Sequence, residues 1–193
     1  MGQVRVDQLE REYDVEVEWR AYLLDPSTPE GGRSHPYPPE IRAQRSGPLR
    51  QMAADAGVTI VDRDWISNSR KAHEAAMFAR DAGSFAPFHR AMLDAYFAHG
   101  RDIGDINVLL ELAGECGLDT VELRAALEDG RYARHVDQDA ALAWRIGFTG
   151  VPAFILGNRA IIGAQPYQVF EEVMALLGRE KRSVVAPPDG SVE

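Results

Sequence analysis

The chain has 193 residues, of which 45% are hydrophobic, and a formal net charge of −9 at pH 7. This length fits one domain with room for an inserted subdomain. The acidic balance disfavours nucleic acid and anionic membranes as partners, because both select a basic protein face. The sequence also lacks an apolar run of the roughly 20 residues that a membrane span needs. We therefore predict neither a nucleic-acid partner nor a membrane partner.

The single cysteine, Cys116, excludes a disulfide within the chain and a zinc site built on cysteines. The first residues lack the basic-then-apolar pattern of a secretory leader, so we predict a cytoplasmic location. Cys116 falls at the C-terminal end of a predicted helix, where partial negative charge disfavours a thiolate. We predict a small, partly buried apolar side chain there, with a redox-sensing thiol as the lesser alternative.

Hydrophobic spacing predicts a helix and a strand first, then a helical block, then two strands and a last helix. Val6, Leu9 and Tyr13 recur at helical spacing, and residues 15–22 alternate apolar and polar side chains. Residues 24–47, rich in Pro, Gly and Ser, predict a long loop. The further helices are expected over 48–56, 70–82, 85–97, 108–113, 121–127, 132–146 and 167–177, and the paired strands near 153–163.

The most informative stretch is the corner Gly150-Val151-Pro152, which stands directly before the apolar residues 153–156. Proline is tolerated at the first position of a strand. We predict that the Val151–Pro152 peptide bond is cis, which would make a locked corner. The sequence from Gly147 to Phe154 and the later segment Gly-Ala-Gln-Pro resemble motifs of the DsbA family, specifically of its FrnE-like branch. Further segments that resemble this branch are Trp19-Arg20, Leu24–Pro26, Asn68–Arg70, Ala72-His73, Ala95–Phe97, Asp102-Ile103 and Gly163–Gln165.

The resemblance implies an α/β, thioredoxin-like fold with an inserted all-helical subdomain. Residues 1–60 and 143–180 would form the thioredoxin-like domain, 61–142 the helical subdomain, and 181–193 a flexible tail. It also implies a thiol–disulfide oxidoreductase without cofactor or metal. Its partner would be a thiol- or disulfide-containing peptide that pairs, in extended form, with the substrate-side loop Gly150, Val151 and Pro152.

Members of this family carry a Cys-Pro-x-Cys-type motif between the first strand and the first helix, where the helix N-terminus lowers a thiol pKa. Here the first helix begins at once, so the first strand and the motif are expected to be missing, with Met1-Gly2 just after the motif's place. A misassigned start is favoured over truncation or gene decay. We assign no catalytic residue and predict that the chain is inactive in disulfide exchange.

Loss of an internal strand would leave 15–22 and 153–156 without a neighbour in the sheet. We expect this slot to be filled by upstream residues, by the tail segment 182–186, or by a strand of a second molecule in a homodimer.

Two other functions stay open. Relatives of hydroxychromene-carboxylate isomerase or of kappa-class glutathione transferase resemble the same fold and bind glutathione against the same proline loop. A non-catalytic peptide-binding module is the third reading. His73 lies in the family motif Asn-Ser-Arg-x-Ala-His. It is a weaker site candidate than the loop Gly150–Pro152 and would line the cleft. The spacing of the five histidines fits no metal motif, and neither a phosphate loop nor a nucleophile elbow occurs.

Overall fold

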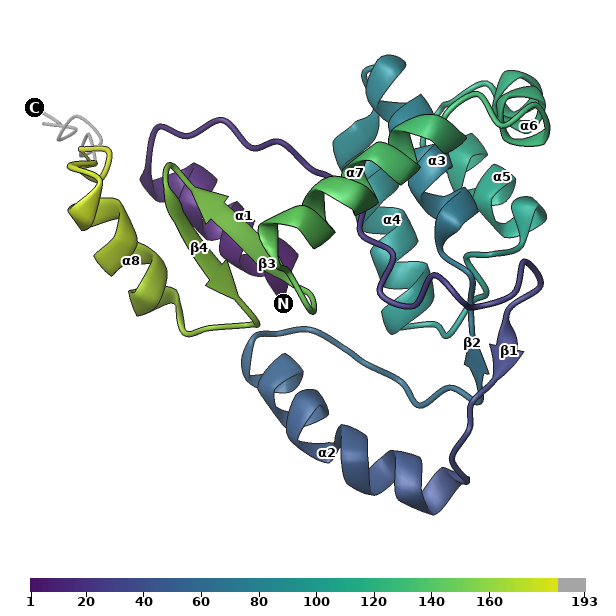
Figure 1. Ribbon diagram of the computed structural model, residues 1–193, viewed down its shortest axis with the longest axis horizontal. Coiled ribbons are helices and arrows are strands. Elements are labelled where there is room, and N and C mark those ends of the chain that lie inside the picture. Colours follow the sequence, from purple (N-terminus) through teal and green to yellow (C-terminus); the bar gives the residue numbers. More distant parts are fainter. Residues whose placement is uncertain (184–193) are drawn as a thin grey trace, which may run out of the picture. The chain divides into compact units, whose positions relative to one another are not determined.

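The structure, a computed structural model, describes residues 1–183, which form eight α-helices and four short β-strands (Figure 1). They group into two compact units, residues 1–19 with 150–183, and Arg20–Thr149. The sequence-based domains place 20–60 and 143–149 with the terminal segments instead. Grouping residues by their contacts does not test domain boundaries that come from a family resemblance, so those boundaries stay a prediction.

The first unit packs two helices on one face of an antiparallel hairpin. It comprises α1 (Gly2–Glu12), β3 (Ala153–Leu156), β4 (Arg159–Ile162) and α8 (Tyr167–Leu176). Phe154 pairs with Ile161, and both side chains pack with Leu9 and Phe170 in one apolar cluster. The Phe154 and Phe170 rings meet edge to face at 4.9 Å. The predicted hairpin, opening helix and last helix are thus confirmed.

The start of the predicted flexible tail is held to this unit. Lys181 Nζ lies 2.6 Å from a carboxylate oxygen of Glu12 and 2.5 Å from one of Glu171. The backbone N–H of Arg182 donates to the carbonyl of Glu12 at 2.7 Å. Residues 184–193 lie outside the described part, as does most of the segment 182–186 that we suggest as a strand.

The second unit is built around helix α3 (Arg70–Asp81), which packs against four other helices (Figure 1). Seven of its 12 residues are buried, so it forms the centre of this unit's core. The other helices of the bundle are α4 (Phe85–Phe97), α5 (Ile106–Glu115), α6 (Thr120–Glu128) and α7 (Ala133–Ile146). This arrangement confirms the helical block that the sequence predicts.

Aspartate caps fix where two of these helices begin. Asp105 Oδ1 accepts from the backbone N–H of Asn107, and Asp119 Oδ1 accepts from Val121 and Glu122. Such a bond satisfies an amide that the helix cannot pair itself. At the start of α3, Asn68 Oδ1 accepts from the N–H of Arg70 at 2.9 Å.

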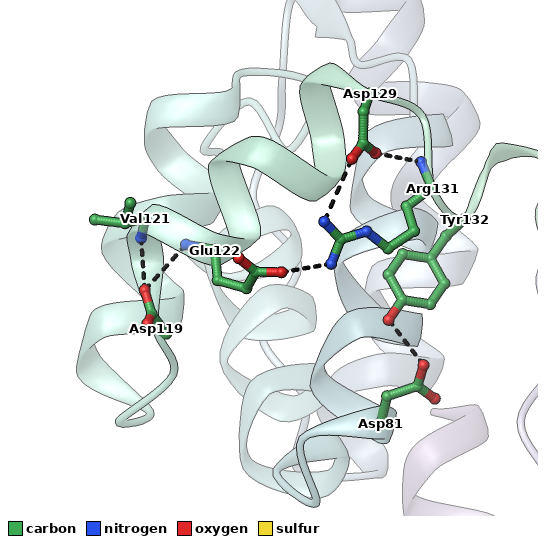
Figure 2. Close-up of polar contacts among 7 residues, drawn as sticks. All are labelled: Asp81, Asp119, Val121, Glu122, Asp129, Arg131 and Tyr132. Carbon is green, nitrogen blue, oxygen red and sulfur yellow. Dashed lines mark hydrogen bonds and ion pairs between the residues drawn. The ribbon is translucent and has the colours of Figure 1, made fainter.

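A polar cluster follows α6 and joins it to α3 (Figure 2). The Arg131 guanidinium donates to Glu122 at 2.6 Å and to Asp129 at 3.3 Å. The next residue, Tyr132, donates its hydroxyl proton to Asp81 Oδ2 at 2.7 Å. Asp81 is the last residue of α3, so this bond holds the turn after α6 against the end of the central helix.

The prediction of a loop over 24–47 followed by a helix over 48–56 is wrong, because α2 spans Pro39–Asp55. Pro39 occupies the first turn, where a missing N–H costs no hydrogen bond. Pro48 lies inside the helix instead of starting it. The sequence also gave no sign of the short pair β1 (Arg33–Ser34) and β2 (Trp65–Ile66), which are too brief for any periodicity.

The predicted strand over 15–22 is also wrong for the described chain, since this segment forms no ladder. Burial still alternates from Val15 to Trp19, so the side-chain pattern was read correctly. A strand needs a neighbour to accept and donate its backbone hydrogen bonds, and no described residue supplies one here.

Candidate functional site

The candidate site centres on the loop before β3. Its Val151–Pro152 peptide bond is cis, which confirms the prediction. The carbonyl of Pro152 accepts a hydrogen bond from Gly163 N–H at 2.8 Å, which continues the pairing of the hairpin into the loop. The Val151 side chain is 53% exposed. The loop is therefore tied to the hairpin through Pro152 and presents Val151 outward.

The first turn of α1 packs directly on this loop. A Cβ built on Gly2 would lie 2.9 Å from Cβ of Pro152, a distance that real Cβ contacts do not show. Among the described residues, no side chain caps the first turn. The positive end of the α1 dipole therefore lies beside Pro152. Burial, and then the nearby Arg5, lower the pKa of the Met1 amine.

A third segment, 163–165, completes the site. Gly163 has a φ of +85°, a left-handed conformation that favours glycine. The backbone carbonyl of Gln165 accepts from Nε of Arg5 at 3.1 Å, and its side-chain amide donates to the carbonyl of Ile162 at 2.9 Å. The family resemblance pointed to 163–165 and placed Gly2 just after the expected motif. It did not predict the contacts of Gly2 with Pro152 or of Arg5 with Gln165, because these join distant segments.

Strand β3 has one paired edge. Within residues 1–183 it pairs only with β4, from Ala153 opposite Ile162 to Leu156 opposite Arg159. The outward-facing Ile155 is 55% exposed. Beside the loop there is thus a strand whose second edge has backbone donors and acceptors that no described strand pairs.

His73 lies in the second unit, on α3, and its ring acts as an anchor for the chain that enters that unit. Nε2 lies 3.2 Å from the carbonyl of Tyr22. Asp139 of α7 binds the same stretch, accepting from Ala21 N–H at 3.0 Å and from Arg20 at 2.9 Å. Burial lowers the pKa of His73. These contacts give His73 a structural role in the second unit, and a place for it in a cleft stays a prediction.

The described histidines build no metal centre, because no group of three metal-binding side chains occurs in residues 1–183. Burial, followed by the charge of nearby His73, lowers the pKa of His89 to about 4. His89 stacks on Phe85 with ring centroids 5.0 Å apart. It is therefore neutral at physiological pH, packed as a side chain of the fold.

Cys116 follows α5 as its C-terminal cap residue and packs, partly buried, against the main core of the second unit. Burial and the neighbouring Glu115 raise the pKa of its thiol. A raised pKa leaves little thiolate at neutral pH, so the side chain behaves as the predicted small apolar residue. None of the helices within residues 1–183 combines the length and apolar character that crossing a bilayer requires.

Residues 1–175 match the family model described as DSBA-like thioredoxin domain. Among curated proteins, YwbO of Bacillus subtilis (strain 168) is 29% identical over 178 residues, which cover 91% of this chain and 88% of that protein.

Solved structures agree with this match at the level of the fold. A probable DsbA oxidoreductase of Streptomyces coelicolor superposes with a TM-score of 0.82 at 27% identity, covering 100% of this chain and 92% of its own. A 2-hydroxychromene-2-carboxylate isomerase superposes with a TM-score of 0.73 at 16% identity, covering 92% and 88%. At that identity the second likeness concerns the fold alone.

Proposed function

Because this chain belongs to the DSBA-like thioredoxin domain family, we propose that it binds thiol- or disulfide-containing peptides in extended form along Gly150–Pro152 and β3. Its fold is the mostly helical DSBA-like thioredoxin fold with few short strands. Within that family we assign it to the FrnE-like branch of thiol–disulfide oxidoreductases, because the sequence motifs around Pro152 and at Gly163–Gln165 resemble that branch.

The observation that carries the proposal is the second edge of β3. An extended peptide can add to such an edge as a further strand, with backbone hydrogen bonds giving affinity and side-chain contacts giving selectivity. Val151 and Ile155, both more than half exposed, would contact alternate side chains of that peptide. Gly150 has no atom within 4 Å of where a Cβ would stand, so a partner's backbone can approach there.

The first turn of α1 supplies the electrostatics that a sulfur partner needs. The positive end of its dipole lies next to Pro152, where it would stabilise the thiolate form of a peptide cysteine. The 193 residues hold one cysteine, and it lies in the other unit. A dithiol–disulfide cycle needs two thiols in one site. These 193 residues would therefore bind such a peptide without catalysing its oxidation or reduction.

Binding can be tested by amide chemical shifts of the isotopically labelled chain, titrated with a reduced cysteine-containing peptide and with its serine counterpart. We expect the largest shifts at Val151 and over 153–156, and weaker binding of the serine peptide. Ile155→Asp should weaken binding, whereas Val121→Asp on α6 of the other unit should not.

Two outcomes would contradict the proposal. Shifts that avoid 150–156 altogether would remove the peptide site. Shifts there with glutathione, but with neither peptide, would favour the glutathione-binding alternative over peptide recognition.

A further inference from the structure

Helix α2 buries little of its own surface. Of its 17 residues only Ala53 is buried. The helix is held to the chain that follows it by polar contacts: Arg42 donates to both carboxylate oxygens of Asp62, and the carbonyl of Ala53 accepts from Val58 N–H at 2.8 Å. The Arg42 side chain is only 11% exposed. The inward face of α2 is thus polar or small.

An apolar row runs along the helix beside this side. Ile41, Leu49 and Met52 are between 40% and 48% exposed, and Pro48 is exposed beside them. At about 100° per residue these four side chains fall within an arc of roughly 100°. We call them the α2 stripe. A soluble surface helix normally buries such a row, and a contiguous exposed apolar row marks a contact surface.

The charge on the stripe is positive, on a chain whose net charge is −9. By the same helical spacing Arg45 lies between Ile41 and Leu49, and its guanidinium is 4.4 Å from the centre of the Tyr37 ring. Within residues 1–183 no carboxylate forms an ion pair with it. Asp55, one turn after Met52, accepts a hydrogen bond from Gln51 at 2.8 Å.

From this arrangement we propose that the α2 stripe binds an amphipathic segment of another protein that presents apolar side chains and a carboxylate for Arg45. Arginine favours this pairing because its guanidinium binds a carboxylate with two parallel hydrogen bonds. A second copy of the chain fits less well. In a two-fold antiparallel pairing of stripes, Arg45 lies near the midpoint and would face its own counterpart. The proposal concerns a surface separate from Gly150–Pro152 and goes beyond the proposed function.

The test uses a fluorescein-labelled peptide of about 15 residues, made of leucine and glutamate so that the leucines line one helical face. Its fluorescence anisotropy is followed as the full chain is added. We expect saturable binding that Leu49→Ser with Met52→Ser weakens by about tenfold or more. Arg45→Gln should weaken binding of this peptide but not of one with glutamine in place of glutamate. The control Val121→Ser, at a site 80% exposed on α6, should bind like the parent.

Three results would overturn the proposal: no binding, binding unchanged by the stripe substitutions, or equal binding of a lysine-for-glutamate peptide. Sedimentation velocity of the chain alone adds a fourth, since self-association abolished by Leu49→Ser would make a second copy the occupant. Because the substituted side chains are exposed, circular dichroism should show an unchanged fold in every variant.

Discussion

Gly2 and Pro152 are in such close contact that the space between them excludes a methyl group: a Cβ on Gly2 would stand 2.9 Å from Cβ of Pro152 and 3.7 Å from the Phe154 ring. The contact joins the first turn of α1 to the loop before β3. Since that loop is the centre of the candidate peptide site, the position of the helix end and the shape of the site depend on each other.

We therefore predict that Gly2→Ala destabilises the first unit and displaces the loop. Inserting one carbon into a well-packed contact costs about 1–3 kcal/mol, because neighbouring groups must shift. Chemical denaturation would measure the loss, and amide shifts at Val151 and Ala153 would report the displacement. Gly178→Ala cannot serve as a control, because Gly178 has a φ of +69°. Gly31→Ala can, since open space and an ordinary φ surround Gly31. Equal stability of Gly2→Ala and the parent chain would contradict the contact.

A second prediction concerns Glu74, which is fully buried on α3. Nζ of Lys71 lies 3.4 Å from its carboxylate and also donates to the carbonyl of Leu127 on α6. Removing one partner of a buried pair leaves an uncompensated charge. We expect Lys71→Met to destabilise the chain by about 3 kcal/mol near neutral pH. Lys71→Met with Glu74→Gln should recover much of this loss.

The pH dependence of that loss has a definite sign. Burial raises the pKa of Glu74 above its ordinary value, although Lys71 partly opposes the shift. A carboxyl with a raised pKa contributes its stability below the unfolded-state pKa and loses it as pH rises through the folded-state pKa. Urea unfolding at about pH 5 and about pH 7.5 should therefore show a smaller deficit of Lys71→Met at the lower pH. A deficit that grows on acidification would contradict the buried charge.

Local signals predicted the fold wherever a short stretch decides the structure. Asp105 and Asp119 are N-cap residues of a type that favours helix starts, and the hairpin over 153–162 follows its apolar runs. The interpretation failed at α2, because proline spacing over 36–48 resembles a loop although Pro39 suits a first helical turn. It failed over 15–22 for another reason. Alternating apolar and polar residues indicate which side of a segment is buried, but they do not show whether a neighbouring strand is present to pair with its backbone.

The candidate site was predicted only in part for a related reason. Gly150–Pro152 carries a sequence pattern strong enough to be recognised by resemblance. The contacts of Gly2 with Pro152 and of Arg5 with Gln165 join segments at opposite ends of the chain. No propensity or periodicity encodes such pairs, since they arise only when α1 is packed on the hairpin.

A third prediction concerns Tyr132, whose hydroxyl group binds Asp81 at the end of α3. Tyr132→Phe removes this bond, and we expect a loss of about 1 kcal/mol in the free energy of unfolding. Tyr37→Phe is the matched control, because the Tyr37 side chain is exposed and contacts Arg45 only through its ring. A loss as large in the control would mean that the bond to Asp81 contributes nothing specific.

The same tyrosine should titrate late. Burial, and then the hydrogen bond to Asp81, raise the pKa of Tyr132 to about 12. The stability that this group contributes is complete below the ordinary tyrosine pKa of about 10 and is lost as pH rises through about 12. Ultraviolet difference spectra of the parent chain and Tyr132→Phe should differ by one phenol that ionises near pH 12.

The last prediction concerns the thiol chemistry of Cys116. Cys116 is the single cysteine, lies partly buried after α5, and has a pKa raised by burial and Glu115. We expect slow reaction with a soluble disulfide reagent at neutral pH, accelerating as pH rises toward the raised pKa, because only the thiolate attacks. The purified chain should not turn over a dithiol substrate, and Cys116→Ser should change neither this result nor peptide binding. Turnover that survives Cys116→Ser would require chemistry other than thiol exchange. Turnover lost in that variant would instead make Cys116 the nucleophile and move the active site to the helical unit.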